Sequence, residues 1–296
     1  MTAAAAGRKP LTRAGAIGWS IAFLLLGFAF TVLFYSIYAL LRYGSVIAGT
    51  SSVNALGVEY TVSAGWAQLL GFALATLIIG VRVLRLGADD LRWRPRDGRG
   101  RGRGFAVGLL LGVGAALIAL LLAIPAGGGW SADQGTLGSY VGRVGLTFAA
   151  LAAPALSEEI AFRGLPLVLL ASVFGRWPAL VALAVVFAVA HALNPHATPF
   201  AIANIALAGI LLGVAFFAPG GIWTAFGAHL GWNAALAAAD APVSGMPFTI
   251  PFINHHAGSP VWLTGGAFGP EGGLTATIAI AAAIAVAARW ARKGIA

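Results

Sequence analysis

Long apolar segments alternate with short polar breaks along most of the chain. An apolar helix of about 20 residues crosses a hydrocarbon core of about 30 Å, and uncharged stretches of that length recur throughout the sequence. The breaks between them are rich in Gly and Pro, as expected of helix ends. The pattern predicts an all-α fold, a polytopic transmembrane helical bundle with about eight spans. The expected spans are 14–41, 63–83, 105–125, 140–174, 177–193, 200–217, 222–239 and 273–290.

Composition agrees with a membrane protein, since 59% of the 296 residues are hydrophobic and 9% are charged. A soluble globular domain carries roughly 25% charged residues, so this class is excluded. There is no cysteine, which excludes thiol catalysis.

The net charge of +9 comes from basic residues that gather in three regions. These are Arg8, Lys9 and Arg13 before the first span; Arg82, Arg85, Arg92, Arg94, Arg96, Arg99, Arg101 and Arg103 around one loop; and Arg289, Arg292 and Lys293 at the end of the chain. If all three regions are cytoplasmic, the positive-inside rule is satisfied with few exceptions. We therefore expect a multi-pass protein of the cell membrane with both termini in the cytoplasm. The basic loop is expected to contact anionic lipid; no nucleic-acid partner is expected, because no basic face with interleaved aromatics accompanies it.

Three further features concern the organisation of the chain. The segment 140–174 is too long for one straight crossing and contains Pro154 and Pro166, so it is expected to be tilted or kinked. Gly209 and Gly213 form a GxxxG pair that predicts a close contact between helices. The long polar and aromatic segment 241–272 is expected to face away from the cytoplasm.

Two adjacent carboxylates stand apart from the other acids. Seven of the nine acidic residues lie in or beside polar connections, whereas Glu158 and Glu159 lie inside a hydrophobic segment. A charge within hydrocarbon costs a few kcal/mol and is a functional hypothesis by default. Glu159 and Arg163 are four residues apart and share a helical face, while Glu158 is rotated by about 100°. Arg163 can then neutralise Glu159 and leave Glu158 to act as a general base; alternatively, all three form a buried ion-pair cluster that joins helices.

Polar residues of two later spans favour the first reading. Phe187 and His191 are four apart on one expected span, and His229 and Asn233 are four apart on another. A single His in an apolar helix is usually a hydrogen-bonded core residue, and an Asn is usually a link between helices. Convergence of these side chains with Glu158 would instead supply a base, a second base or ligand, and donors for an oxyanion.

The segments that carry these residues are SEEIAFRG, FAVAHALNP and AFGAHLGWN, which reproduce in order the motifs EExxxR, FxxxH and HxxxN. They resemble the CPBP family, the CAAX-protease and bacteriocin-processing group of intramembrane proteases, also called the Abi family. The supporting segments LPLVLLASVFG and ANIALAGILLGVAFFAPGGIWTAFGAHLGWN extend the resemblance over about residues 140–240. The chain is expected to have two parts: 1–104, with two transmembrane helices and a basic cytoplasmic loop, and 105–296, a CPBP-like protease core with a final transmembrane helix.

The resemblance also implies roles for the motif residues. Glu158 corresponds to the catalytic glutamate, which activates water together with His191. Glu159 and Arg163 correspond to the supporting ion pair. His229 and Asn233 correspond to the residues that stabilise the tetrahedral oxyanion.

The resemblance leaves the catalytic type open between a metalloendopeptidase and a glutamate-type peptidase. Glu158, His191 and His229 could be three ligands of a catalytic zinc with water in the fourth position. The HExxH signature of soluble zinc peptidases is absent, so direct activation of water without a cofactor is the preferred prediction.

The expected function is that of an intramembrane endopeptidase that hydrolyses a protein or peptide substrate, with lipidated substrates included. Two alternatives remain from the residues. One is a non-catalytic scaffold or immunity-type binding protein of the same family, and the other is a transporter that uses Glu158 and Glu159 as a proton or cation site. The intact motif set argues against both, and the absence of an apparent repeat weakens the transporter further.

Overall fold

A computed structural model of the chain describes residues 11–46, 57–96, 98 and 100–292. Four of the basic residues expected in the cytoplasm lie outside these ranges: Arg8, Lys9, Arg99 and Lys293. The longer helical elements are α1 (Arg13–Tyr43), α3 (Gly57–Ala75), the π-helix η3 (Thr76–Val83), α4 (Arg101–Ala123), α5 (Leu137–Glu159), the π-helical turn η5 (Ile160–Gly164), α6 (Leu165–Phe174), α7 (Arg176–Ala190), α8 (Pro199–Phe217), α9 (Ile222–Ala238) and α11 (Leu274–Arg292). The short elements are η4 (Ile124–Ala126), β1 (Gly129–Ala132), β2 (Ile253–His256), α10 (Val261–Thr264), η6 (Gly266–Phe268) and η7 (Pro270–Gly272).

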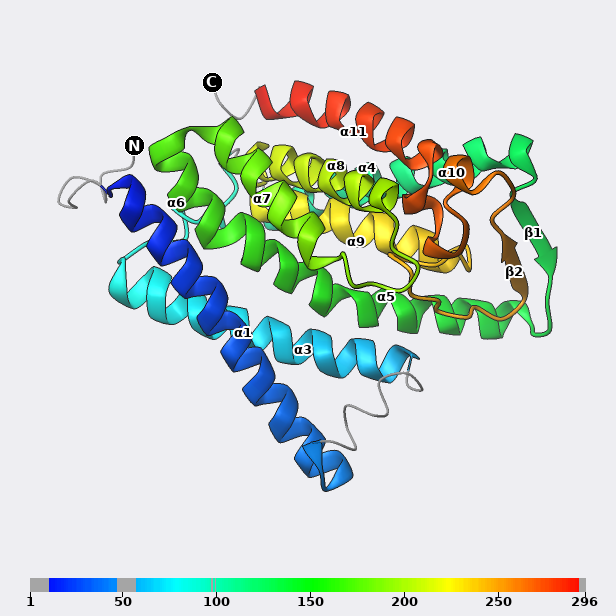
Figure 1. Cartoon of the computed structure of the whole chain (residues 1–296), viewed down its shortest axis with the longest axis horizontal. Coiled ribbons are helices and arrows are strands. Elements are labelled where there is room, and N and C mark those ends of the chain that lie inside the picture. The colour runs from blue at the N-terminus through cyan, green and yellow to red at the C-terminus, as the bar shows by residue number, and fades with distance from the viewer. Residues whose placement is uncertain (1–10, 47–56, 97, 99, 293–296) are drawn as a thin grey trace.

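The helices form one bundle (Figure 1), and the prediction of a polytopic all-α membrane protein is confirmed. Within the described residues, six helices are long and apolar enough to cross a membrane. The sequence predicts about eight spans; the other two correspond to α7 and α9, which have 15 and 17 residues. At 1.5 Å per residue, α7 is about 22 Å long, which is shorter than the hydrocarbon core. Helix α1 begins and α11 ends at the same end of the bundle (Figure 1); which side of the membrane this end faces stays a prediction.

The long segment expected at 140–174 is one continuous helical run, Leu137–Phe174, with an irregular turn inside it. The irregular turn is η5, which begins directly after Glu159. Pro166 has no N–H to donate to the carbonyl one turn earlier, and the chain widens into a π-helical turn just before it. Such turns are frequent at functional sites, and this one carries Arg163.

Helix α9 carries two of the motif residues and packs against α4, α5 and α8. Its contact with α4 is made backbone to backbone, because Gly108 and Gly112 of α4 lie directly against the carbonyls of Thr224 and Ala228. A methyl group at either glycine would overlap these carbonyl oxygens. Small residues at such a contact are typical of membrane helices, and this contact fixes the position of the helix turn that carries His229.

A second close contact joins α7 to α8. A Cβ atom on Gly209 would lie 2.9 Å from Cα of Ala184, and one on Gly213 would lie 2.7 Å from Cγ of Leu180. The GxxxG pair therefore marks a close contact between helices, as predicted.

One residue of the basic loop has a structural role. The guanidinium of Arg92 is buried and donates hydrogen bonds to the carbonyls of Phe216, Phe217 and Ala218 at 3.0, 3.0 and 2.8 Å. These carbonyls close the C-terminus of α8, where a cation is favourable. Burial, together with the nearby cations Arg96 and Arg176, lowers the pKa of Arg92 to about 10, so the group stays charged at neutral pH.

The segment between α9 and α11 leaves the bundle and returns to it. It pairs β2 with β1 in an antiparallel two-stranded sheet at one end of the molecule (Figure 1), with Trp130 opposite His255. It then passes through α10, η6 and η7 before α11 begins. Both ends of this segment lie against the pocket described next.

Candidate active site

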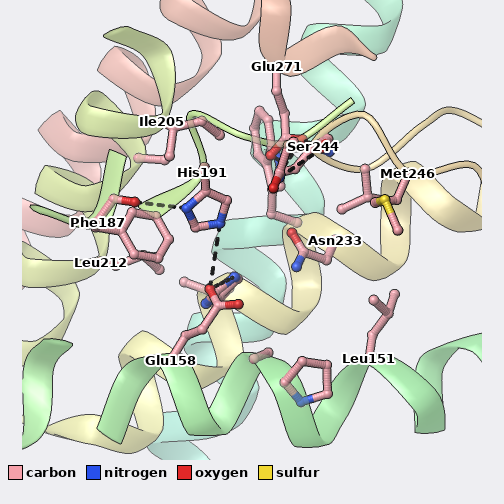
Figure 2. A pocket seen from close by; sticks show the side chains of 18 of the residues that line it. Leu151, Glu158, Phe187, His191, Ile205, Leu212, Asn233, Ser244, Met246 and Glu271 are labelled. Atoms are coloured by element: carbon pink, nitrogen blue, oxygen red, sulfur yellow. Dashed lines mark hydrogen bonds and ion pairs between the residues drawn. The ribbon is translucent and has the colours of Figure 1, made fainter. Parts of the chain in front are cut away.

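Five of the motif residues line a pocket of about 180 Å³ within the bundle: Glu158, Phe187, His191, His229 and Asn233. Most of the lining comes from α5, α7, α8 and α9, with further residues from α3, α11 and the segment between α9 and α11. Glu158 rises into this space from α5, His191 enters from the end of α7 and Asn233 enters from α9 (Figure 2). The expectation that these side chains converge is met by the geometry.

Glu159 and Arg163 form the ion pair that their spacing predicts. The distance from Arg163 Nη1 to Glu159 Oε1 is 3.1 Å, and the two side chains are 3% and 0% exposed. Arg163 also donates to the carbonyl of Gly209 at 3.2 Å and lies 4.4 Å above the centre of the Phe187 ring. The pair therefore fastens α5 and η5 to α7 and α8.

The same carboxylate also orients His229. Nδ1 of His229 lies 2.8 Å from Glu159 Oε1, and both groups are buried. An ionised carboxylate only accepts hydrogen bonds, so with Glu159 ionised the proton is on Nδ1. This places the lone pair of neutral His229 on Nε2, which points towards Glu158.

His191 is oriented in the same way by a backbone carbonyl. Its Nδ1 donates to the carbonyl oxygen of Phe187 at 2.8 Å, because a carbonyl oxygen cannot donate. The Phe187 ring packs 4.5 Å from the His191 ring and 6.1 Å from the His229 ring, measured between ring centres. Phe187 thus holds both imidazoles, and the lone pair of neutral His191 is on Nε2.

Both Nε2 atoms face one oxygen of Glu158. Oε2 of Glu158 lies 3.9 Å from Nε2 of His191 and 3.7 Å from Nε2 of His229, and its side chain is 21% exposed. Both distances exceed the hydrogen-bond range, and this buried oxygen has no hydrogen-bond partner within the described chain. Two imidazole acceptor atoms thus face one carboxylate oxygen, and a water molecule at this point could donate to two of the three.

Asn233 lines the same pocket one helical turn beyond His229. Its amide points into the space between Glu158 and the residues opposite (Figure 2). The amide N–H groups can donate to an oxygen of a bound molecule.

Glu158, His191 and His229 are the residues that would have to hold a zinc ion. Catalytic zinc takes ligands at about 2.0–2.2 Å in tetrahedral geometry. Among the described residues, no group of three or more His, Asp or Glu side chains is arranged to hold a metal ion. As placed, Glu158, His191 and His229 therefore do not fit a metal centre.

Two polar residues that line the pocket opposite Glu158 come from the segment between α9 and α11. Glu271, expected in a polar connection, is 4% exposed and lines the pocket, as does Ser244. Figure 2 shows both on the side opposite Glu158. The sequence marked Glu271 only as an acid close to the last apolar span, which did not set it apart from the other acids in polar connections.

The fold and the pocket define a class: an integral membrane protein with a Glu, His and Asn cluster inside a helical bundle. Residues 141–235 match the family model described as Type II CAAX prenyl endopeptidase Rce1-like. All six motif residues assigned to the site fall within this segment, so the resemblance to the CPBP family is confirmed there. No curated protein and no solved structure matches the chain.

Proposed function

We propose that the protein is an intramembrane endopeptidase in which Glu158 activates water for attack on a peptide bond. The observation that carries this proposal is Oε2 of Glu158, a buried oxygen without a hydrogen-bond partner among the described residues. It faces the Nε2 atoms of His229 and His191 at 3.7 and 3.9 Å. A water in this space donates one hydrogen to Oε2 of Glu158 and the other to Nε2 of His191. Its oxygen lone pair is then directed at the substrate carbonyl carbon.

The reaction balances with the groups present. As the water oxygen bonds to the carbonyl carbon, Glu158 takes its proton and the carbonyl oxygen becomes an oxyanion. Asn233 donates an amide N–H to this oxyanion, and His229 donates from Nε2 when it carries a second proton. Glu158 then delivers its proton to the leaving nitrogen, the C–N bond breaks, and a carboxyl group and an amine result.

Glu159 and Arg163 support the site without touching the substrate in this scheme. Glu159 lies against both the guanidinium of Arg163 and Nδ1 of His229, so its negative charge favours a proton on His229. Their burial keeps the orientation of His229 fixed, which favours the reaction because preorganised donors need no rearrangement.

The family description suggests the first substrate to test. Its name refers to prenylated CAAX proteins, so a farnesylated fluorogenic peptide ending in Cys-Val-Ile-Met is the probe of choice. The purified protein is expected to cleave it, and Glu158→Ala or His191→Ala is expected to abolish turnover while the protein stays folded. A comparison of proteome and secretome between wild type and Glu158→Ala would identify cellular substrates.

The alternatives give different results in the same experiments. Full biological activity of Glu158→Ala would overturn the protease in favour of a scaffold or immunity-type protein. Loss of cleavage on chelation, with a bound metal found in the purified protein, would replace direct activation of water with a metal-dependent route.

A further inference from the structure

Glu271 is a buried carboxylate on the wall of the pocket that the proposed reaction does not use. It lies in η7 and is 4% exposed. Burial raises the pKa of Glu271 above its ordinary value, and the pocket lining contains no Lys or Arg among its described residues. Burying a carboxylate without a cation costs free energy unless hydrogen bonds compensate it. The hydrogen-bond partners of Glu271 are therefore the groups that it holds in place.

The carboxylate joins α9 to the segment that follows it. Oε1 of Glu271 accepts a hydrogen bond from Nε1 of Trp232 at 3.0 Å, and Oε2 accepts from Oγ of Ser244 at 3.0 Å. The backbone N–H of Ser244 also donates to Oε2. Trp232 directly precedes Asn233, so Glu271 connects Ser244 to the helix turn that carries the proposed oxyanion donor.

Ser244 is held in an uncommon backbone conformation. Its φ is +48° and that of Gly245 is +84°, and the two form a tight turn closed by hydrogen bonds between Val243 and Met246. A residue other than Gly in the left-handed region is strained and persists where its surroundings determine it. Glu271 accepts hydrogen bonds from the N–H and the hydroxyl of Ser244. The side chain of Asn194 donates to the backbone carbonyl of Ser244 at 3.0 Å.

This turn forms part of the pocket wall. Val243, Met246 and Phe248 line the pocket beside Ser244, and Figure 2 places Met246 across the space from Glu158. Asn194, which lies in the turn after His191, ties the same wall to the end of α7. The wall is therefore fixed relative to both helices that carry the histidines.

We propose that Glu271 is a positioning residue that holds the segment Val243–Phe248 as the substrate-contacting wall opposite Glu158. This inference rests on the proposed function: Glu158 performs the chemistry, and the wall held by Glu271 determines how tightly the residue beside the scissile bond is bound. The pocket of about 180 Å³ is smaller than the roughly 300–1,000 Å³ of sites that enclose a drug-sized ligand. It accommodates a single side chain against Val243, Met246 and Phe248.

The first test follows the wall itself and needs no substrate. Glu271→Gln removes a charge and one of the two acceptor oxygens, and Trp232→Phe removes the N–H donor while Glu271 remains. Hydrogen exchange of the backbone in 243–248 is expected to rise in both variants of the full-length protein. The matched control is Asp133→Asn. The exposed carboxylate of Asp133 accepts a hydrogen bond from the backbone N–H of Gln134, and its replacement should leave hydrogen exchange in 243–248 unchanged. Unchanged exchange in both Glu271→Gln and Trp232→Phe would overturn the proposal.

The second test separates binding from chemistry. With the farnesylated Cys-Val-Ile-Met peptide, Glu271→Gln is expected to raise KM about tenfold and change kcat less than about threefold. The preference for this peptide over one with Asn in place of Val is expected to shrink towards unity. Loss of kcat with unchanged KM and unchanged preference would overturn the positioning role.

Failure of the two proposals can be told apart. Binding of the same labelled peptides is measured in Glu158→Gln, with and without Glu271→Gln, so that no hydrolysis is required. Weaker binding in the double variant supports the wall even if the wild-type protein does not cleave the peptide, which would count against the protease alone. If Glu271→Gln does not fold, Trp232→Phe decides both tests.

Discussion

The buried pair of Glu159 and Arg163 offers a quantitative test of how the site is held together. Both side chains are almost completely buried, and their closest atoms are 3.1 Å apart. Removal of one partner leaves an uncompensated charge, which costs about 3–5 kcal/mol in proteins. The loss of unfolding free energy in Glu159→Gln should reach this range, because no carboxylate is then hydrogen-bonded to Arg163, whose remaining contacts include the Gly209 carbonyl and the ring of Phe187.

Arg163→Met should lower the free energy of unfolding by less, about 2–4 kcal/mol. Glu159 keeps its hydrogen bond with His229 at 2.8 Å, and a proton taken up by His229 would balance the charge of Glu159. The double variant Glu159→Gln, Arg163→Met carries no unpaired charge. Its cost should therefore fall below the sum of the single costs by about 2–3 kcal/mol.

The assay is reversible unfolding of the purified protein in mixed micelles by SDS titration, followed by tryptophan fluorescence. The double variant should be folded yet inactive, since His229 loses the charged partner that orients it. Additive costs within about 0.5 kcal/mol would refute the reasoning, as would a Glu159→Gln cost below about 1 kcal/mol.

Three further predictions concern stability. Gly112→Ala should destabilise the protein by about 1–3 kcal/mol through overlap with α9, whereas Gly114→Ala, which faces open space, should be neutral or stabilising; equal effects in thermal unfolding would contradict this. Arg92→Ala should lower the free energy of unfolding by about 2–5 kcal/mol, because three hydrogen bonds from a charged donor are lost. Arg94→Ala, at an exposed position, should lower it by less than about 1 kcal/mol; equal losses in the same unfolding measurement would contradict this. Burial raises the folded-state pKa of Glu271, so its protonated form stabilises the fold at low pH. This contribution is lost as pH rises from about 4.5 through the folded-state pKa. Over that range the Tm of wild type should therefore fall relative to the Tm of Glu271→Gln.

Local spacing predicted those parts of the site that lie on one helix. Glu159 and Arg163 pair because residues four apart share a face, and the same rule separates Glu158 from them. Phe187 and His191 are likewise one turn apart, and their contact follows. The convergence of Glu158, His191 and His229 on one pocket rested on the motifs, because spacing within single helices does not determine which faces meet.

Other parts could not be predicted in this way. Glu271 meets Ser244 and Trp232 across 27 and 39 residues of sequence, so no periodicity relates them. The positive φ of Ser244 gave no signal, since Ser has no preference for the left-handed region. The contact of Gly112 with α9 also required the arrangement of helices, because a glycine in a membrane helix can face lipid as readily as a neighbour.

The central claim is that Glu158 activates the attacking water. The most direct measurement is single-turnover cleavage of the farnesylated Cys-Val-Ile-Met peptide by wild type and by Glu158→Gln, with peptide affinity measured in parallel. We expect the cleavage rate constant of Glu158→Gln to fall by at least about 10³-fold, with peptide affinity and unfolding free energy close to those of wild type. Cleavage by Glu158→Gln at a rate within about tenfold of wild type would contradict it.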